Sequence, residues 1–209
     1  MKILGSVFRT EPLDGPPAHA VGASDFAFRK RQDGGYTIAH RGAGLAEIVP
    51  DSFRLLFDYL PSLVKQRHEL RLRLGERFLE EARTPKRWSL DAETPFERMR
   101  ILDPRPSEPI LAEAKRNLIA AFPAFAELRI KESWGGLIDA TPDAVPVIGE
   151  VPRLPGFFLA TSFSGHGFGI GPGAGRLIAD LVSGRTPMID PKPFRLERFA
   201  RLERTTRAG

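Results

Sequence analysis

Glycine occupies every second position from Gly165 to Gly175, directly after an apolar run at 157–161 and the triplet 162–164. A strand, a glycine-rich loop and a helix in this order present backbone N–H groups to an anionic or electron-rich ligand. The dinucleotide fingerprint G-x-G-x-x-G fails in every register of this stretch, and the phosphate-loop pattern G-x-x-x-x-G-K-[ST] does not occur. Alternate glycines indicate instead a flat group lying against the backbone, where side chains would leave no room.

Two alternatives stay open for this loop. It can be a tight corner between a strand and a helix that holds no ligand, and His166 within it is either a catalytic group or a residue that hydrogen-bonds and shapes the loop. The other histidines, His19, His40 and His68, lack the spacing of metal ligands, and the chain contains no cysteine. We therefore expect no metal site.

Composition limits the class of protein. The 209 residues are 42% apolar and 27% charged, which is typical of a folded globular chain. No apolar run approaches the ~18–20 residues that span a bilayer, and the N-terminus lacks the apolar core of a signal peptide, so we expect a cytoplasmic protein without a membrane span. The net charge of +5 is concentrated at 191–209. Because no aromatic platform accompanies that charge, a solvated C-terminal helix or a frayed tail is favoured over nucleic-acid binding.

The first third predicts antiparallel strands. The segment 3–10 is apolar and β-branched, and alternating runs at 26–29 and 36–40 flank the turn sequence 32–35, whose glycines permit a tight hairpin. Apolar residues from Phe53 to Val64 then recur at helical spacing, with Asp51 or Ser52 as a cap and a break or kink at Pro61.

Further elements follow the same logic. Leu70–Leu74 alternates strictly and predicts a half-buried strand, 76–82 a helix, 107–122 a helix with proline in its first turn, and 129–134 another strand. Short apolar runs at 146–149 and 157–161 predict buried strands, and Pro172–Ser183 a helix after the glycine loop.

The predicted fold class is α+β, with a largely antiparallel sheet, flanking helices and a C-terminal strand, glycine loop and helix. We predict three consecutive parts at 1–131, 132–190 and 191–209, the last of them a basic tail; the family resemblance described next implies that the first is a substrate-binding domain and the second part of a cofactor domain.

Four motifs in a fixed order resemble one family. The motifs follow one another within 40 residues. They are Trp134-Gly-Gly-Leu-Ile-Asp139, Thr141-Pro-Asp143, Pro146-Val-Ile-Gly149 and Ser164-Gly-His-Gly-Phe-Gly-Ile-Gly-Pro-Gly173. Together they resemble the C-terminal part of FAD-dependent oxidoreductases of the D-amino-acid oxidase and dehydrogenase class, which includes glycine and sarcosine oxidases. The strand at 3–10 and the hairpin resemble the substrate domain of that family.

The resemblance implies FAD as cofactor and an amino acid or amine as substrate, oxidised at its C–N bond by hydride transfer to flavin N5. It places the glycine loop at the pyrimidine end of the flavin, where backbone N–H groups stabilise developing charge. The implied cofactor-binding residues are Gly165, His166, Gly167, Phe168, Gly169 and Ile170. The residues expected to bind substrate are Arg31, Arg41 and Trp134, because Ile138 stands where several family members carry a carboxylate-binding arginine.

The family's glycine fingerprint for the ADP half of FAD does not occur in this chain. We therefore expect these 209 residues to be the C-terminal portion of an incomplete FAD-binding domain, to bind FAD weakly or not at all alone, and to need an N-terminal Rossmann half in the same chain or in a partner subunit. The alternative is a non-catalytic truncated remnant or subunit of the same fold that does not bind FAD by itself.

Overall fold

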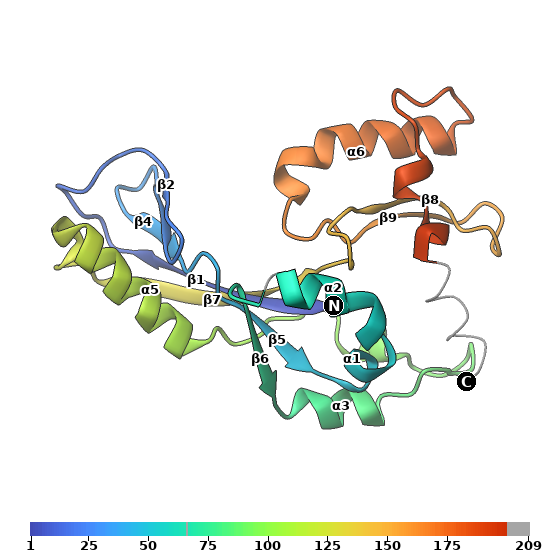
Figure 1. Ribbon diagram of the computed structural model, residues 1–209, viewed down its shortest axis with the longest axis horizontal. Coiled ribbons are helices and arrows are strands. Elements are labelled where there is room, and N and C mark those ends of the chain that lie inside the picture. Colours follow the sequence, from blue (N-terminus) through green and yellow to red (C-terminus); the bar gives the residue numbers. More distant parts are fainter. Residues whose placement is uncertain (66, 200–209) are drawn as a thin grey trace. The chain divides into compact units, whose positions relative to one another are not determined.

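The computed structural model describes residues 1–65 and 67–199 (Figure 1). The chain forms two compact units that interleave along the sequence. The sheet unit comprises 3–49 and 67–137, and the glycine-helix unit comprises 1–2, 50–65 and 138–199. The consecutive domains expected from the sequence stay a prediction.

Seven strands form the sheet in the order β2–β3–β4–β1–β5–β6, with β7 also paired to β1. Their bounds are β1 Lys2–Thr10, β2 Val21–Gly22, β3 Ala27–Lys30, β4 Tyr36–Ala39, β5 Gly44–Ile48, β6 Leu70–Leu74 and β7 Ile130–Asp139. The pairs β1–β4, β1–β5, β2–β3 and β3–β4 are antiparallel, whereas β5–β6 is parallel. The largely antiparallel sheet predicted from the sequence is confirmed.

The hairpin β3–β4 closes through Gly34, whose φ of 82° is accessible to glycine at no steric cost. Its register pairs Phe28 with Ile38, so both side chains enter the same core. The helix α5, Glu108–Ala121, lies along the sheet and contributes two buried leucines to that core (Figure 1). The buried members of this aromatic core are Phe8, Phe26, Phe28, Tyr36, Ile38, Leu111, Leu118, Phe125 and Leu128.

The remaining elements of the sheet unit are short. They are α3 Arg77–Arg83, α4 Pro95–Arg98 and the 3-10 turn η1 Pro123–Phe125. The helix α4 begins with a capping box, in which the Thr94 side chain accepts from the Glu97 N–H and the Glu97 carboxylate accepts from the Thr94 N–H. The helices predicted at 76–82 and 107–122 are confirmed within a residue or two at each end.

The strand β6 corrects one prediction. Leu70–Leu74 is a strand as expected, but it is not half-buried, because Leu72 is 59% exposed and Leu74 is 70% exposed. It lies at the edge of the sheet, where its only strand neighbour is β5. The alternation of leucine and arginine determines which face of the strand each side chain lies on. Burial of the leucine face also requires another element to pack against it, and the alternation does not provide one.

The glycine-helix unit contains a two-stranded antiparallel sheet of β8, Val147–Glu150, and β9, Phe158–Thr161. The helix α6, Gly167–Val182, packs over it (Figure 1), and Ile148, Ala174 and Leu177 form the buried centre of the contact. The 3-10 turns η2, Lys192–Phe194, and η3, Leu196–Phe199, follow. The basic segment, expected to be a solvated C-terminal helix or a frayed tail, forms these two turns up to residue 199, and its remaining residues lie outside the described part of the chain.

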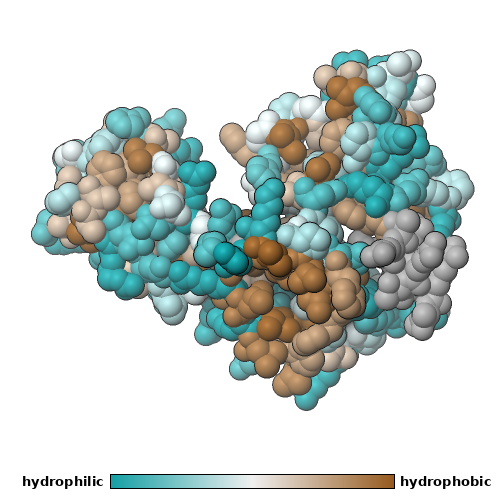
Figure 2. All heavy atoms as spheres, viewed as in Figure 1, coloured by the Kyte–Doolittle hydropathy of each residue, from teal (hydrophilic) through white to brown (hydrophobic). Residues whose placement is uncertain are grey.

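The predicted helix at 51–64 consists of two helices, α1 Pro50–Arg54 and α2 Leu56–Lys65. The interruption falls at Leu55, so the break predicted at Pro61 is wrong, and Pro61 lies inside α2. Proline here removes only the N–H that would reach the Phe57 carbonyl, and at this exposed position water can satisfy that carbonyl. Within the unit, the apolar side chains of α1 and α2 are exposed (Figure 2), with Phe57 77% and Phe53 64% accessible.

None of the helices formed by the described residues is both long and apolar enough to cross a bilayer.

Candidate functional site

The loop between β9 and α6 has an uncommon backbone. Ser162, Ser164 and Gly165 all have positive φ, at 58°, 51° and 84°. Glycine adopts this conformation freely, but each serine does so at a cost, so surrounding contacts must hold it. The Ser162 hydroxyl donates to Asp139 Oδ2 at 2.7 Å, and the Thr141 N–H donates to Ser164 Oγ at 3.2 Å. The residues after β7 thus fix the loop that precedes the glycine helix.

The extent of the glycine loop differs from the prediction. The loop expected at 165–173 is mostly helix, because α6 begins at Gly167 rather than at Pro172. Glycine has weak helix propensity, so the sequence alone suggested a loop. Packing of Ala174 and Leu177 on the small sheet stabilises the second half of the helix, which the glycine-rich first turns extend.

The start of α6 leaves backbone donors available. In the part of the chain that the structure describes, the N–H groups of Gly165, Gly167 and Phe168 have no hydrogen-bond acceptor. The first N–H groups of any helix lack an intrahelical partner, and the helix dipole makes this end electropositive. These groups can therefore bind an acceptor that carries or develops negative charge.

The glycines of α6 that follow its first residue are also uncovered. A Cβ added at Gly169, Gly171, Gly173 or Gly175 would meet no atom of the described chain within 4 Å beyond the helix itself. Phe168 is 103% exposed, whereas the buried residues of the helix, Ala174, Leu177 and Asp180, lie from its eighth residue onward. The chain's own packing does not require these glycines.

The open glycine positions of α6 can be tested for their fit to a flat ligand. Because each glycine in a helix interior costs up to about 1 kcal/mol relative to alanine, four open ones weaken α6 by about 3–4 kcal/mol. A cradle that Cβ atoms would fill, next to unpaired N–H donors, fits the pyrimidine end of an isoalloxazine ring, which presents carbonyl and nitrogen acceptors. The residues that would hold it are those predicted, Gly165 to Ile170.

His166 lies just before α6, at its N-cap position, and its side chain does not cap the helix. Its N–H donates to the Phe163 carbonyl at 2.9 Å, and its imidazole has no partner among the described residues. The backbone of His166 therefore closes the turn into the helix, and both roles considered for its side chain stay open.

The residues predicted to bind substrate belong to the sheet unit and are not brought together. Arg31 lies at the turn end of the β3–β4 hairpin, where its Nε is 3.3 Å from Asp33 Oδ2. Arg41 follows β4 at the opposite end of the hairpin and has no ion-pair partner in the described chain. Trp134 is half-buried in β7, beside Gly135, whose backbone approaches Leu4 and Pro104.

Two titratable groups near the loop have shifted pKa values. Partial burial raises the pKa of Asp143, but hydrogen bonds from Arg198 and the Val145 N–H outweigh it, so the net pKa is below its usual value. Burial, with the negative charges of Asp139, Asp143 and Asp58, raises the pKa of Tyr59 to about 12. Asp143 is thus an ionised, fully engaged turn residue, as its place in Thr-Pro-Asp predicts.

The sequence did not single out the side chains that hold the loop. Ser162, Ser164, Asp139 and Thr141 lie within the quoted motifs or beside them, but no spacing rule predicts their pairing. The one available signal was a Ser-x-Ser-Gly sequence between a strand and a helix, which is compatible with left-handed backbone.

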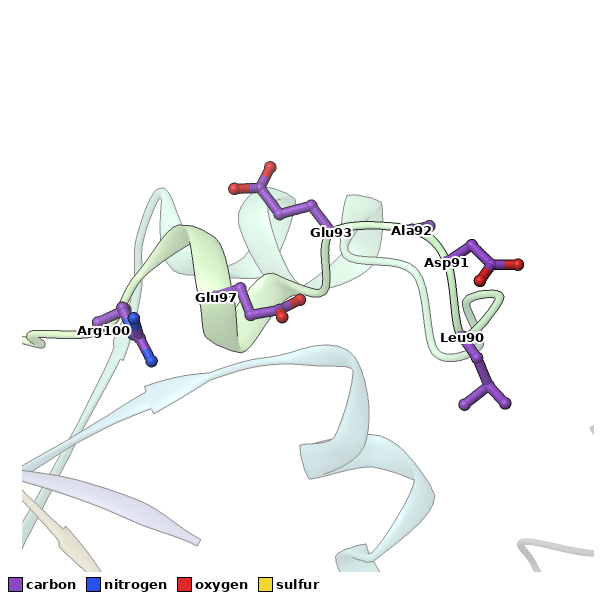
Figure 3. Close-up of a pocket in the computed structure, with 6 residues that line it drawn as sticks. All are labelled: Leu90, Asp91, Ala92, Glu93, Glu97 and Arg100. Atoms are coloured by element: carbon purple, nitrogen blue, oxygen red, sulfur yellow. The ribbon is translucent and has the colours of Figure 1, made fainter.

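A shallow hollow in the sheet unit does not belong to this site (Figure 3). It is lined by Leu90, Asp91, Ala92, Glu93, Glu97 and Arg100. Glu97 caps α4, and Glu93 pairs with Arg98 at 3.1 Å. These two carboxylates are already engaged, and the described residues contain no cluster suited to a metal ion.

Comparisons with curated proteins agree with the motifs. The chain is 34% identical over 92 residues to a glycine oxidase of Pseudomonas aeruginosa, covering 44% of this chain and 25% of the relative. It is 31% identical over 160 residues to a D-amino acid dehydrogenase of Paramagnetospirillum magneticum, covering 77% of this chain and 31% of the relative. The chain thus spans about a third or less of these relatives.

Solved structures extend the similarity to nearly all of the fold. The L-amino acid deaminase from Proteus vulgaris has a TM-score of 0.88 and 32% identity, with 95% of this chain and 46% of that chain covered. A glycine oxidase from Geobacillus kaustophilus, at 17% identity and a TM-score of 0.58, shares the fold. The model of the FAD dependent oxidoreductase family matches residues 1–181. With the motifs, the fold and these comparisons in agreement, the chain belongs to the FAD-dependent oxidoreductase family.

Proposed function

We propose that this chain is the substrate-domain and flavin-proximal portion of an FAD-dependent oxidoreductase that oxidises the C–N bond of an amino acid or a related amine. The observation that carries the proposal is the start of α6, where Gly169 and Gly171 leave open space near unpaired N–H donors. The names of relatives, which include enzymes of both D- and L-amino acids, support an amino acid as the substrate class.

The residues have distinct roles in this proposal. FAD, when bound, supplies the two-electron oxidation of the substrate. The N–H groups of Gly165, Gly167 and Phe168 orient the pyrimidine end of the ring, and the electropositive end of α6 favours negative charge there. The open positions along α6 let the ring lie close to the backbone, so bulk water is excluded from that face.

Arg41 is the better candidate of the two predicted arginines for binding a substrate carboxylate. Arg31 is already engaged with Asp33 and Thr37, whereas Arg41 has no acceptor in the described chain. A guanidinium group pairs with a carboxylate through two parallel hydrogen bonds. The anthranilate named with the Proteus myxofaciens L-amino acid deaminase is likewise a carboxylate beside an amine.

The partner in this proposal is the ADP-binding half of the family fold, supplied in the same polypeptide or by another subunit. The loop at 162–166 and the start of α6 offer donors to only one end of FAD. Binding through that end alone must offset the whole association cost of several kcal/mol. We therefore expect weak binding of FAD to the 209-residue chain, and turnover only when the other half is present.

The test is titration of FAD into the full chain, followed by flavin fluorescence, with two matched variants. Gly169→Ala fills the open face near the donors and is expected to weaken binding several-fold while stabilising the helix. Gly175→Ala gives the same helix stabilisation two turns further along and is expected to leave binding unchanged.

Equal affinities for the wild type and both variants would contradict the placement of the flavin. Tight FAD binding with turnover of an amine substrate would show that the chain needs no further half. Binding without turnover after the other half is supplied would favour the non-catalytic alternative.

A further inference from the structure

The C-terminal turn η3 holds the Thr-Pro-Asp turn that follows β7. Arg198 donates from Nε to Asp143 Oδ2 at 2.8 Å and from Nη2 to Asp143 Oδ1 at 3.3 Å. Its Nη2 also donates to the Val145 carbonyl at 2.5 Å, and its Nη1 to the Arg195 carbonyl at 3.0 Å. All three nitrogens of a guanidinium that is only 16% exposed are therefore used within this unit.

The contacts of Arg198 continue to the loop before α6. The Val145 carbonyl that accepts from Arg198 also accepts from Thr141 Oγ1 at 2.9 Å. The Thr141 N–H donates to Ser164 Oγ at 3.2 Å, and that hydroxyl donates to the Ser162 carbonyl at 3.3 Å. Each hydroxyl in this series donates one hydrogen bond, so the series is internally consistent.

The loop at the end of this series requires such support. Ser162 and Ser164 both have positive φ, a conformation that persists only when neighbouring contacts over-determine it. Ser164 is held from the turn by Thr141, and its own N–H donates to the Asp139 carbonyl at 3.2 Å. The direction of the loop in turn sets the direction of the unpaired N–H groups at the start of α6.

We propose that Arg198 is a positioning residue for the flavin-facing loop, acting through Asp143 and the hydrogen bonds that connect the turn to Ser164. It touches neither substrate nor flavin. The assignment of the loop to the flavin rests on the proposed function, whereas the connection from Arg198 to the loop rests on contacts within the glycine-helix unit. A segment that the sequence presents as a basic tail thus belongs to the support of the site.

Arginine is specifically suited to this role. Its planar fork bonds both carboxylate oxygens and a carbonyl at once, whereas lysine presents a single point charge. The guanidinium also lies 4.1 Å from the centroid of the Phe199 ring, which orients its plane. Arg198→Lys is therefore expected to restore only part of what Arg198→Leu removes.

The test is amide hydrogen exchange of the full chain, followed by mass spectrometry. In Arg198→Leu, we expect exchange of the peptides covering 141–145 and 162–166 to rise about tenfold, because local openings of this size are governed by a few hydrogen bonds. Exchange at 174–182 in α6 is expected to stay unchanged. Arg185→Leu is the matched control, because Arg185 is exposed and its side chain has no partner in the described chain.

A pair of further variants separates positioning from general stability. Asp143→Asn should reproduce the effect of Arg198→Leu, and the double variant should add little, since both remove the same connection. Unchanged exchange at 162–166 in a folded Arg198→Leu chain would overturn the proposal. A uniform rise that includes 174–182 would also overturn it, because it would reveal only a loss of global stability.

Addition of FAD gives an arm that tests the proposed function separately. Slower exchange at 162–166 of the wild-type chain with FAD supports the flavin assignment. FAD is added at a concentration that saturates the weak binding measured in the titration. If Arg198→Leu loosens the loop but bound FAD leaves the wild-type loop unaffected, the flavin-facing role of the loop is contradicted, while the connection from Arg198 to the loop is supported.

Discussion

The aromatic core of the sheet unit and the first half of α6 use their residues in opposite ways. In the core, Phe8, Tyr36 and Phe125 are completely buried, and Phe125 meets Tyr36 and Phe28 edge-to-face at 4.9 Å. In the first half of α6, Phe168 is fully exposed and successive glycines face open space. One region is filled by its own side chains, and the other leaves space that the described residues do not fill.

The surroundings of individual glycines differ between the two regions in the same way. At Gly35 and Gly135, an added Cβ would lie 2.4 Å from the backbone carbonyls of Thr10 and Pro104, so the chain's own close approach excludes a side chain there. At Gly171, no atom of residues 1–65 or 67–199 outside the helix's own backbone excludes one. Glycine at Gly35 and Gly135 is therefore required by folding, whereas at Gly171 it weakens the helix without relieving any contact within the described residues.

The largest expected difference in the free energy of unfolding comes from replacing one phenylalanine in each region. Phe125→Ala should lower the free energy of unfolding by about 3–5 kcal/mol, because it leaves a cavity among packed rings. Phe168→Ala should change it by less than about 0.5 kcal/mol. Urea denaturation followed by far-UV circular dichroism measures both. Similar losses for the two variants would remove the distinction between the regions.

The second effect has opposite signs in the two regions. Gly135→Ala should destabilise the chain by about 1–3 kcal/mol, since a backbone carbonyl must move to admit the methyl group. Gly171→Ala should stabilise it by up to about 1 kcal/mol. The same denaturation experiment checks both variants, and a loss of stability in Gly171→Ala would place a chain contact where the structure has none.

A smaller effect concerns alkaline pH and the glycine-helix unit. The Tyr59 pKa is raised to about 12 by burial and nearby carboxylates, above the ordinary value of 10. Since the native state holds this proton more tightly than the unfolded state, its contribution is present below pH 10 and is lost as pH rises toward 12. Between pH 10 and pH 12, the free energy of unfolding of Tyr59→Phe should therefore decrease by about 1 kcal/mol less than that of the wild type. Parallel pH profiles of the two proteins would contradict this.

The smallest effect concerns acidic pH and the sheet unit. The Arg71 guanidinium holds the pKa of Glu113 at about 2, with both hydrogen bonds at 2.7 Å. Because the native pKa lies below the ordinary value of 4.5, the contribution is complete above about pH 4.5 and is lost as pH falls toward 2. Arg71 is 44% exposed, so we expect less than about 1 kcal/mol.

Denaturation of wild type and Glu113→Gln at several acidic pH values measures this contribution. The difference between them should shrink as the pH decreases. A difference that stays constant down to pH 2 would mean that the carboxylate charge is not what stabilises the contact.

The sequence predicted the elements of both regions but only part of the site. The hairpin, α5 and the small sheet follow from local patterns, since turn glycines, alternation and helical spacing act over a few residues. The start of α6 does not follow from local patterns, because tertiary packing at Ala174 and Leu177 overrides the low helix propensity of its glycines. The support from Arg198 could not be predicted either, since it joins residues 55 positions apart through side-chain geometry alone.

The uneven composition of α6 also has a kinetic consequence. A turn rich in glycine, with Pro172 unable to donate, is a poor nucleus for a helix, whereas the segment from Ala174 to Val182 has apolar side chains that dock on β8. We therefore expect α6 to form from its C-terminal half and to extend backward toward Gly167. The donors at its N-terminus would then be the last part of the helix to become ordered during folding and the first to fray.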